Sequence, residues 1–99
     1  GVEHDLTVEW VNEQISKPCS YCKQKLSKLD MTLDRINNNI GHVKVNLVPS
    51  CKRCNYFRRD MPYDAWVILA KNMPKIVKSS LLDGWSAGAG LRGVRKNNV

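Results

Sequence analysis

The sequence has no apolar run long enough to cross a membrane, since a spanning helix needs about 20 consecutive apolar residues. Acidic side chains are also scarce. Only 9 of the 99 residues are Asp or Glu, against 16 Lys or Arg, so the formal net charge is +7 at pH 7. There is no internal repeat. These shortages exclude a membrane partner, a solenoid and an acidic protein, and they favour one small basic domain.

Cysteine occurs only four times, and the four copies form two Cys-x-x-Cys pairs, Cys19/Cys22 and Cys51/Cys54. Four thiolates at this spacing satisfy tetrahedral zinc, and so small a domain often needs such a staple. The alternative is two disulfides in a secreted domain, but no signal-peptide pattern is present. We therefore expect a structural Zn²⁺ and an intracellular, reducing compartment, the cytoplasm or nucleus, with a viral or phage origin left open.

The positive charge is concentrated in residues 17–59, where ten Lys or Arg stand against two Asp. Residues 1–16 carry four acidic residues and no Lys or Arg. A local excess of this kind is typical of a surface that binds a polyanion. A basic, solvated surface without a partner is the alternative.

The pattern of apolar and turn-forming residues predicts a short series of elements. Thr7 can cap a first helix over residues 7–17, which Pro18 ends. Strands are expected at residues 31–36 and 44–48. Ser50 is expected to cap a helix over residues 51–59, and another helix follows over 61–72. From residue 83 the composition becomes glycine-rich and basic, which is typical of a tail.

The segment between and around the cysteine pairs carries four motifs: LDRI at residues 33–36, GH at 41–42, NLVP at 46–49 and CKRCN at 51–55. Together they resemble the zinc-bearing branch of the HNH endonucleases, also called ββα-metal or His-Me finger nucleases, over residues 18–60. The resemblance implies an α+β fold with a zinc-stapled ββα-metal core, an N-terminal helix and C-terminal helices. It places a single domain at residues 1–82 and a basic Gly-rich tail at residues 83–99.

The resemblance also implies roles for individual residues. Asp34 and Asn55 match positions that hold a catalytic divalent metal, and Asn46 matches the residue that holds the loop by side-chain hydrogen bonds. Mg²⁺ or Mn²⁺ fits such a site because hard cations prefer oxygen ligands. The cation would stabilise charge on the scissile phosphate.

Arg35 departs from the family pattern, because the best-known members carry the general-base His at this position. A guanidinium cannot accept a proton near neutral pH, but it can bind a phosphate bidentately. His42 is the remaining imidazole in the motif and is the candidate base. An ordinary loop residue is the alternative for His42.

Basic residues recur along the expected helix over residues 51–59. Lys52, Tyr56 and Arg59 fall at positions i, i+4 and i+7 and so share one face of this helix, and Arg53 and Arg58 flank that face. Together with Arg35, these residues are the predicted nucleic-acid contacts: Lys52, Arg53, Tyr56, Arg58 and Arg59.

The sequence thus predicts an HNH-like endonuclease domain that hydrolyses phosphodiester bonds of DNA with a divalent metal. The alternative function is a non-catalytic, zinc-stabilised nucleic-acid-binding or assembly module that has lost the general base. A zinc-stapled protein-interaction domain is a third reading, but it leaves the basic asymmetry and the Asp34/Asn55 pair without a purpose.

Overall fold

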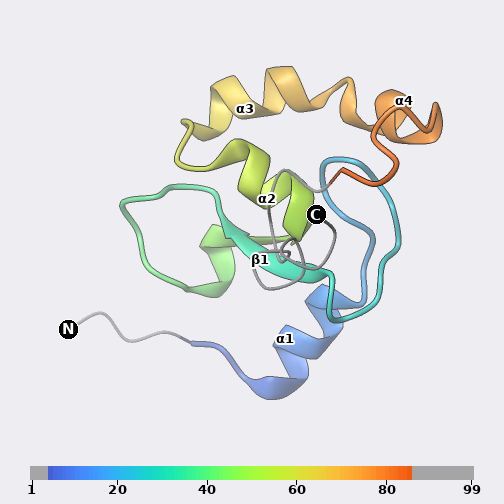
Figure 1. Cartoon of the computed structure of the whole chain (residues 1–99). Helices are drawn as coiled ribbons and strands as arrows, with labels where there is room; N and C mark the ends of the chain where they lie inside the picture. Colours follow the sequence, from blue (N-terminus) through green and yellow to red (C-terminus); the bar gives the residue numbers. More distant parts are fainter. Residues whose placement is uncertain (1–4, 86–99) are drawn as a thin grey trace, which may run out of the picture.

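A two-stranded antiparallel sheet with helices around it organises the computed structural model, which describes residues 5–85 (Figure 1). The α+β class expected from the sequence is confirmed. The elements follow in the order α1 (Val8–Ile15), β1 (Met31–Arg35), η1 (Lys44–Asn46), β2 (Leu47–Cys51), α2 (Lys52–Arg58), α3 (Tyr63–Ala70) and α4 (Met73–Lys78).

Helix α1 begins as the sequence predicts, because the Thr7 hydroxyl oxygen accepts a hydrogen bond from the Trp10 backbone N–H at 3.1 Å. It ends two residues earlier than expected. The Lys17 N–H bonds the Gln14 carbonyl at 3.1 Å, which tightens the last turn. Pro18 then disfavours the helical conformation at the residue before it. Both strands contact α1, which lies below the hairpin in Figure 1.

The hairpin pairs Met31 with Cys51 at one end and Arg35 with Leu47 at the other. The second strand starts three residues later than expected, because the 3₁₀ helix η1 occupies the predicted start. Pro49 is tolerated within β2 because each strand of a two-stranded sheet is an edge. Its carbonyl accepts a bond from the Ser20 N–H at 2.9 Å, so the first cysteine loop docks on β2.

Helix α2 leaves the end of β2 without an intervening loop. Cys51, and not Ser50, is its N-cap, so the predicted cap was wrong by one residue. The strand continues through Cys51, which leaves the Ser50 hydroxyl buried and donating to the Cys51 carbonyl at 3.1 Å. Helix α2 ends where Arg59 adopts a positive φ of 55°.

The helix predicted over residues 61–72 is shorter in the structure. There α3 ends at Ala70, and α4 begins at Met73. The Pro62 carbonyl accepts the Trp66 N–H at 3.0 Å, which starts α3. Pro74 does not end a helix. It lies in the first turn of α4, where the missing N–H of proline removes no helical bond. Both helices lie above α2 in Figure 1.

The core gathers around the four cysteines and the indole of Trp66, which is 1% exposed. The Trp66 ring meets the Tyr21 ring edge to face, with centroids 5.2 Å apart. Among the residues described, no helix combines the length and the apolar character that crossing a membrane requires. Residues 86–99 of the predicted tail lie outside the described residues.

Candidate metal centre and basic helix face

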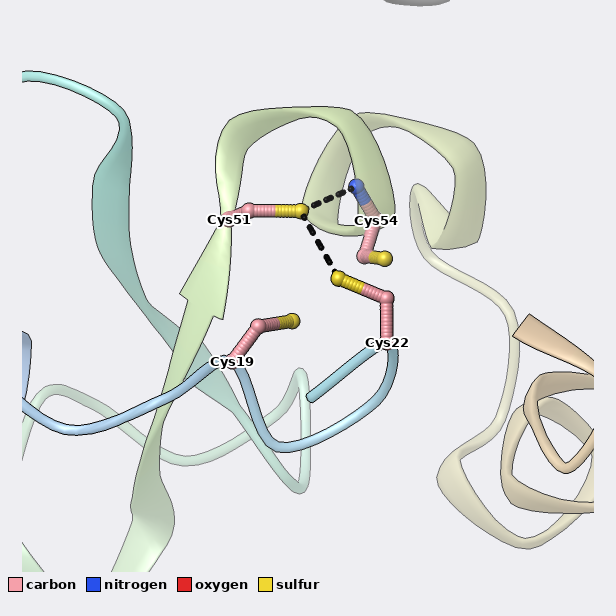
Figure 2. A group of neighbouring side chains, drawn as sticks. All are labelled: Cys19, Cys22, Cys51 and Cys54. Atoms are coloured by element: carbon pink, nitrogen blue, oxygen red, sulfur yellow. Dashed lines mark hydrogen bonds between the residues drawn. The ribbon is translucent and has the colours of Figure 1, made fainter. Parts of the chain in front are cut away.

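The four cysteine sulfurs converge on one point, as Figure 2 shows. All four side chains are buried, and their Sγ atoms lie within 4.8 Å of one another. Two sulfurs come from the loop before β1, one from the end of β2 and one from the first turn of α2. We call this set the cysteine cluster: Cys19, Cys22, Cys51 and Cys54.

The cluster has dimensions that fit a tetrahedral metal. Sulfurs held at about 2.3 Å from zinc stand about 3.8 Å apart along a tetrahedron's edge. The Cys22 and Cys51 sulfurs are 3.8 Å apart. The four residues are free cysteines, so the sulfurs are available as ligands. The cluster could therefore hold a metal ion such as zinc.

Backbone N–H groups point at two of the sulfurs. The Tyr21 N–H donates to the Cys19 sulfur at 3.4 Å, and the Cys54 N–H donates to the Cys51 sulfur at 3.4 Å. Hydrogen bonds to a charged form favour it. These bonds therefore favour thiolates, the form that a metal needs.

The hydrogen bonds within the cluster shift the pKa values of the four thiols in opposite directions. Hydrogen bonding from Cys22, Cys51 and Cys54 lowers the pKa of Cys19. The bond with Cys19 raises the pKa of Cys22, but those with Cys51 and Cys54 outweigh it and lower the pKa to about 7. Hydrogen bonds with Cys19 and Cys22 raise the pKa values of Cys51 and Cys54. Four adjacent thiolates repel one another, so a cation is needed to ionise all four.

The first cysteine loop is a tight turn closed at both ends. The Cys19 N–H donates to the Gln24 carbonyl at 2.9 Å, and the Lys23 N–H donates to the Cys19 carbonyl at 3.0 Å. To close this turn, Lys23 adopts a φ of 66°. A side chain at this φ is strained. The chain therefore accepts a local cost at Lys23 to bring Cys19 and Cys22 together.

Asp34 lies inside the protein. Its exposure is 4%, and its Oδ2 accepts a hydrogen bond from Arg58 Nη1 at 2.7 Å and another from the Tyr21 hydroxyl. The sequence placed Asp34 in a solvated metal site. The structure instead surrounds it with a guanidinium and a phenol, because β1 turns this residue toward α2.

Arg58 is also placed differently from the prediction, which assigned it to nucleic acid. It is 1% exposed, and its guanidinium bonds three backbone carbonyls as well as Asp34. The Nε donates to Met61 at 2.9 Å, Nη2 donates to Ile36 at 2.9 Å, and Nη1 also donates to Arg35. Arg58 thus joins the end of β1 to α2 and to the loop before α3, and it cannot reach a phosphate from there.

Asn46 anchors the loop between the strands. Its Oδ1 accepts the Asn37 N–H at 2.8 Å, and its Nδ2 donates to the carbonyls of Asn37, Ile40 and Gly41 at 3.0–3.2 Å. The side chain is buried. These bonds are of the kind that the family resemblance implies for this position, and they fix the loop that carries His42.

The other predicted site residues lie closer to solvent. His42 is exposed, while Arg35 and Asn55 are half-buried. Tyr21 was missed as a partner of Asp34. The two residues are 13 positions apart, and no local sequence pattern indicates that they meet.

The outer side of α2 carries three of the predicted nucleic-acid contacts, while the predicted contact Arg53 is half-buried. Lys52 and Arg59 are exposed, and the Arg59 guanidinium stacks on the Tyr56 ring at 5.1 Å. Its Nη2 also donates to the Tyr56 hydroxyl at 3.4 Å. We call Lys52, Tyr56 and Arg59 the basic helix face. It points away from the cysteine cluster because Cys54 and Arg58 take the inner side of the helix.

Comparison with known proteins gives one viral relative. No family model matches the sequence. The chain is 27% identical over 78 residues to an uncharacterized protein of Acanthamoeba polyphaga mimivirus. The alignment covers 79% of this chain but 15% of the viral protein, so the chain spans a small part of that relative's length.

Proposed function

We propose that this chain is a zinc-stapled, HNH-like module that binds nucleic acid without using Asp34 as a ligand of a catalytic metal. The ion pair between Asp34 and Arg58 carries this proposal. The Arg58 guanidinium already balances the charge of the Asp34 carboxylate. The same guanidinium would repel Mg²⁺ or Mn²⁺ placed beside it. The alternative function named from the sequence is therefore favoured over the catalytic one.

The charge that is left supports binding to phosphates. Within residues 17–59, setting aside the internally paired Arg58 and Asp34 leaves nine basic side chains and one acidic one. Lys52 and Arg59 are exposed on α2. Such side chains bind the phosphate backbone of any sequence and release its counterions.

The local architecture supports the HNH resemblance. The order β1, β2, α2 is that of a ββα unit, with Asn46 bracing the loop between the strands. The cysteine cluster ties the loop before β1 to the junction of β2 and α2. With Zn²⁺ bound, this staple would fix α2 and hold the basic helix face toward its ligand.

A metal-dependent endonuclease is the second candidate function, and the exposure of His42 favours it. An exposed imidazole in the loop between the strands is accessible to water and could act as general base. Asp34 and Asn55 would then hold Mg²⁺ or Mn²⁺, and Arg35 would clamp the phosphate. This arrangement requires Arg58 to leave Asp34.

The binding proposal is tested with the zinc-loaded chain and a fluorescent DNA, by anisotropy at several salt concentrations. The affinity should fall with a log–log slope of about −0.9 for each phosphate contacted on duplex DNA. The double variant Lys52→Glu/Arg59→Glu should bind more weakly and keep its metal. The control Lys75→Glu/Lys78→Glu changes the same charge on α4. Equal losses in both variants would contradict the assignment to the basic helix face.

The choice between binding and cleavage is tested by incubating plasmid and single strands with Mg²⁺, Mn²⁺ or EDTA. We expect no nicking with any of these. Nicking that needs a divalent metal, and that disappears in a folded Asp34→Asn variant, would overturn the non-catalytic proposal. Arg35→His adds an imidazole at the position of the family's general base. Nicking gained only in this variant would support the idea that the wild-type chain has lost its general base.

A further inference from the structure

A row of aromatic rings runs from the core to the surface. The Trp66 ring, which is buried, lies 5.8 Å from the Phe57 ring, and the Phe57 ring lies 5.8 Å from the Trp85 ring. Phe57 is 42% exposed and Trp85 is 44% exposed. We call Phe57 and Trp85 the aromatic pair. Phe57 is a plausible core residue from sequence alone, but the structure leaves much of its ring in solvent.

The aromatic pair leaves apolar surface in water. Phe57 and Trp85 each keep roughly two-fifths of their residue surface exposed, and burial of apolar surface yields about 25 cal/mol per Å². The two planes meet at 90°, so the edge of one ring is set against the face of the other. Rings held in this way present a rigid apolar surface with little freedom left to lose on binding.

A guanidinium stands next to the aromatic pair. Arg53 precedes Phe57 by one helical turn of α2, and its Nη1 donates to the Trp85 carbonyl at 3.4 Å. Within residues 5–85, its Nε is buried and has no hydrogen-bond partner, so this nitrogen cannot reach an external anion. The Nη1 bond is at the long end of the useful range, and Arg53 is half-buried, so the Nη1 and Nη2 end of the guanidinium is the part that could bind an anion such as a phosphate.

We propose that the aromatic pair stacks an unpaired base of a single-stranded nucleic acid, while Arg53 binds the adjoining phosphate. This inference rests on the proposed nucleic-acid binding and names its substrate class. Every base has a π-face, so stacking on aromatic rings tolerates any sequence. In a duplex those faces are covered by neighbouring base pairs. The module therefore prefers single strands, or a strand with an unstacked base, over intact duplex.

The test compares two single strands with the same phosphates, a short oligothymidylate and an abasic strand of equal length. The wild-type chain with zinc bound should prefer oligothymidylate by about 5- to 150-fold, the range that stacking of one base supplies. Trp85→Leu keeps an apolar side chain without a ring system and should abolish most of this preference. Trp85→Tyr restores a ring and should recover part of it.

Leu81→Ala is the matched control, since Leu81 is an exposed apolar residue four positions before Trp85 and has no ring to stack. It should leave the preference unchanged. A variant that merely loses its fold is recognised by its zinc content and by loss of its near-ultraviolet circular dichroism. Arg53→Gln should weaken binding to both strands alike, because it removes a phosphate contact and leaves the stacking surface.

The outcomes separate the two proposals. Equal affinity for the two strands overturns the stacking site and leaves phosphate binding intact. An unchanged preference in Trp85→Leu also overturns it, because the ring would then play no part. Binding to duplex DNA but to neither single strand also overturns the stacking site alone. Binding to none of the three overturns the nucleic-acid proposal itself, and the stacking site with it.

Discussion

The Asp34 carboxylate and the Arg58 guanidinium form a buried ion pair 2.7 Å long that joins β1 to α2. Their side chains are 5% and 0% exposed, so water hardly screens the pair. Both charges also have hydrogen bonds beyond each other, to the Tyr21 hydroxyl and to three backbone carbonyls. These additional hydrogen bonds help to offset the cost of burying the two charges.

Removing one partner of this pair should destabilise the protein strongly. Asp34→Ala leaves the Arg58 charge buried and unpaired, and we expect the free energy of unfolding to fall by about 3–5 kcal/mol. Urea denaturation of the zinc-loaded chain measures this. The expectation differs from that for a solvated metal ligand, whose removal would cost little.

The double variant Asp34→Leu/Arg58→Met provides the control for the ion pair. It removes both charges together, so it should be less destabilised than the sum of the two single variants. Some loss will persist, because the carbonyls of Arg35, Ile36 and Met61 lose their donor. Strict additivity would contradict an energetic coupling between Asp34 and Arg58.

Metal removal should unfold the region around the cysteine cluster. Chelation of zinc leaves four crowded thiols that cannot all ionise, and the free energy of metal binding is also free energy of folding. We expect one zinc per chain by elemental analysis, and loss of near-ultraviolet circular dichroism on adding EDTA. Lowering the pH should have the same effect, because protons compete with the metal for the thiolates. A metal-free chain that keeps its tertiary signal would contradict this prediction.

Substitution of Asn46 should loosen the loop that carries His42. Asn46→Ala removes four part-buried side-chain hydrogen bonds, for a cost of about 2–3 kcal/mol. Hydrogen exchange at the Asn37 amide should quicken. Asn39→Ala, in the same loop and exposed, is the control and should change stability by less than about 0.5 kcal/mol.

Glycine at position 23 should stabilise the protein. Lys23 holds a φ of 66°, which costs a side chain roughly 1–2 kcal/mol. Lys23→Gly removes this cost but adds backbone entropy to the unfolded chain, so we expect a net gain of about 0.5–1 kcal/mol. Lys25→Gly, at an exposed position without a positive φ, should lower stability instead. A loss in both variants would contradict this prediction and would show that the hydrogen bond from Lys23 Nζ to the Ser20 carbonyl, at 2.6 Å, outweighs the relief of strain.

The sequence by itself determined the features that depend on local patterns. The two Cys-x-x-Cys pairs predicted a four-sulfur cluster, since their spacing leaves few other ways to use four cysteines. Thr7 predicted the start of α1, because a capping hydroxyl acts within three residues. Apolar and turn-forming residues placed β1 within one residue of its end. Boundaries such as the start of β2 were less accurate, because η1 depends on hydrogen bonds across the loop.

Only the tertiary structure decided which way the charged side chains point. Arg58 was assigned to the flank of a basic helix face, because helical spacing shows which residues share a side but not which side is buried. Docking of α2 on the hairpin turned Arg58 inward to meet Asp34, and it left Phe57 half in solvent beside Trp85. These orientations arise from contacts between segments far apart in the chain. They decide whether Asp34 belongs to a buried ion pair or to a metal site, and whether Phe57 is a core ring or part of a binding surface.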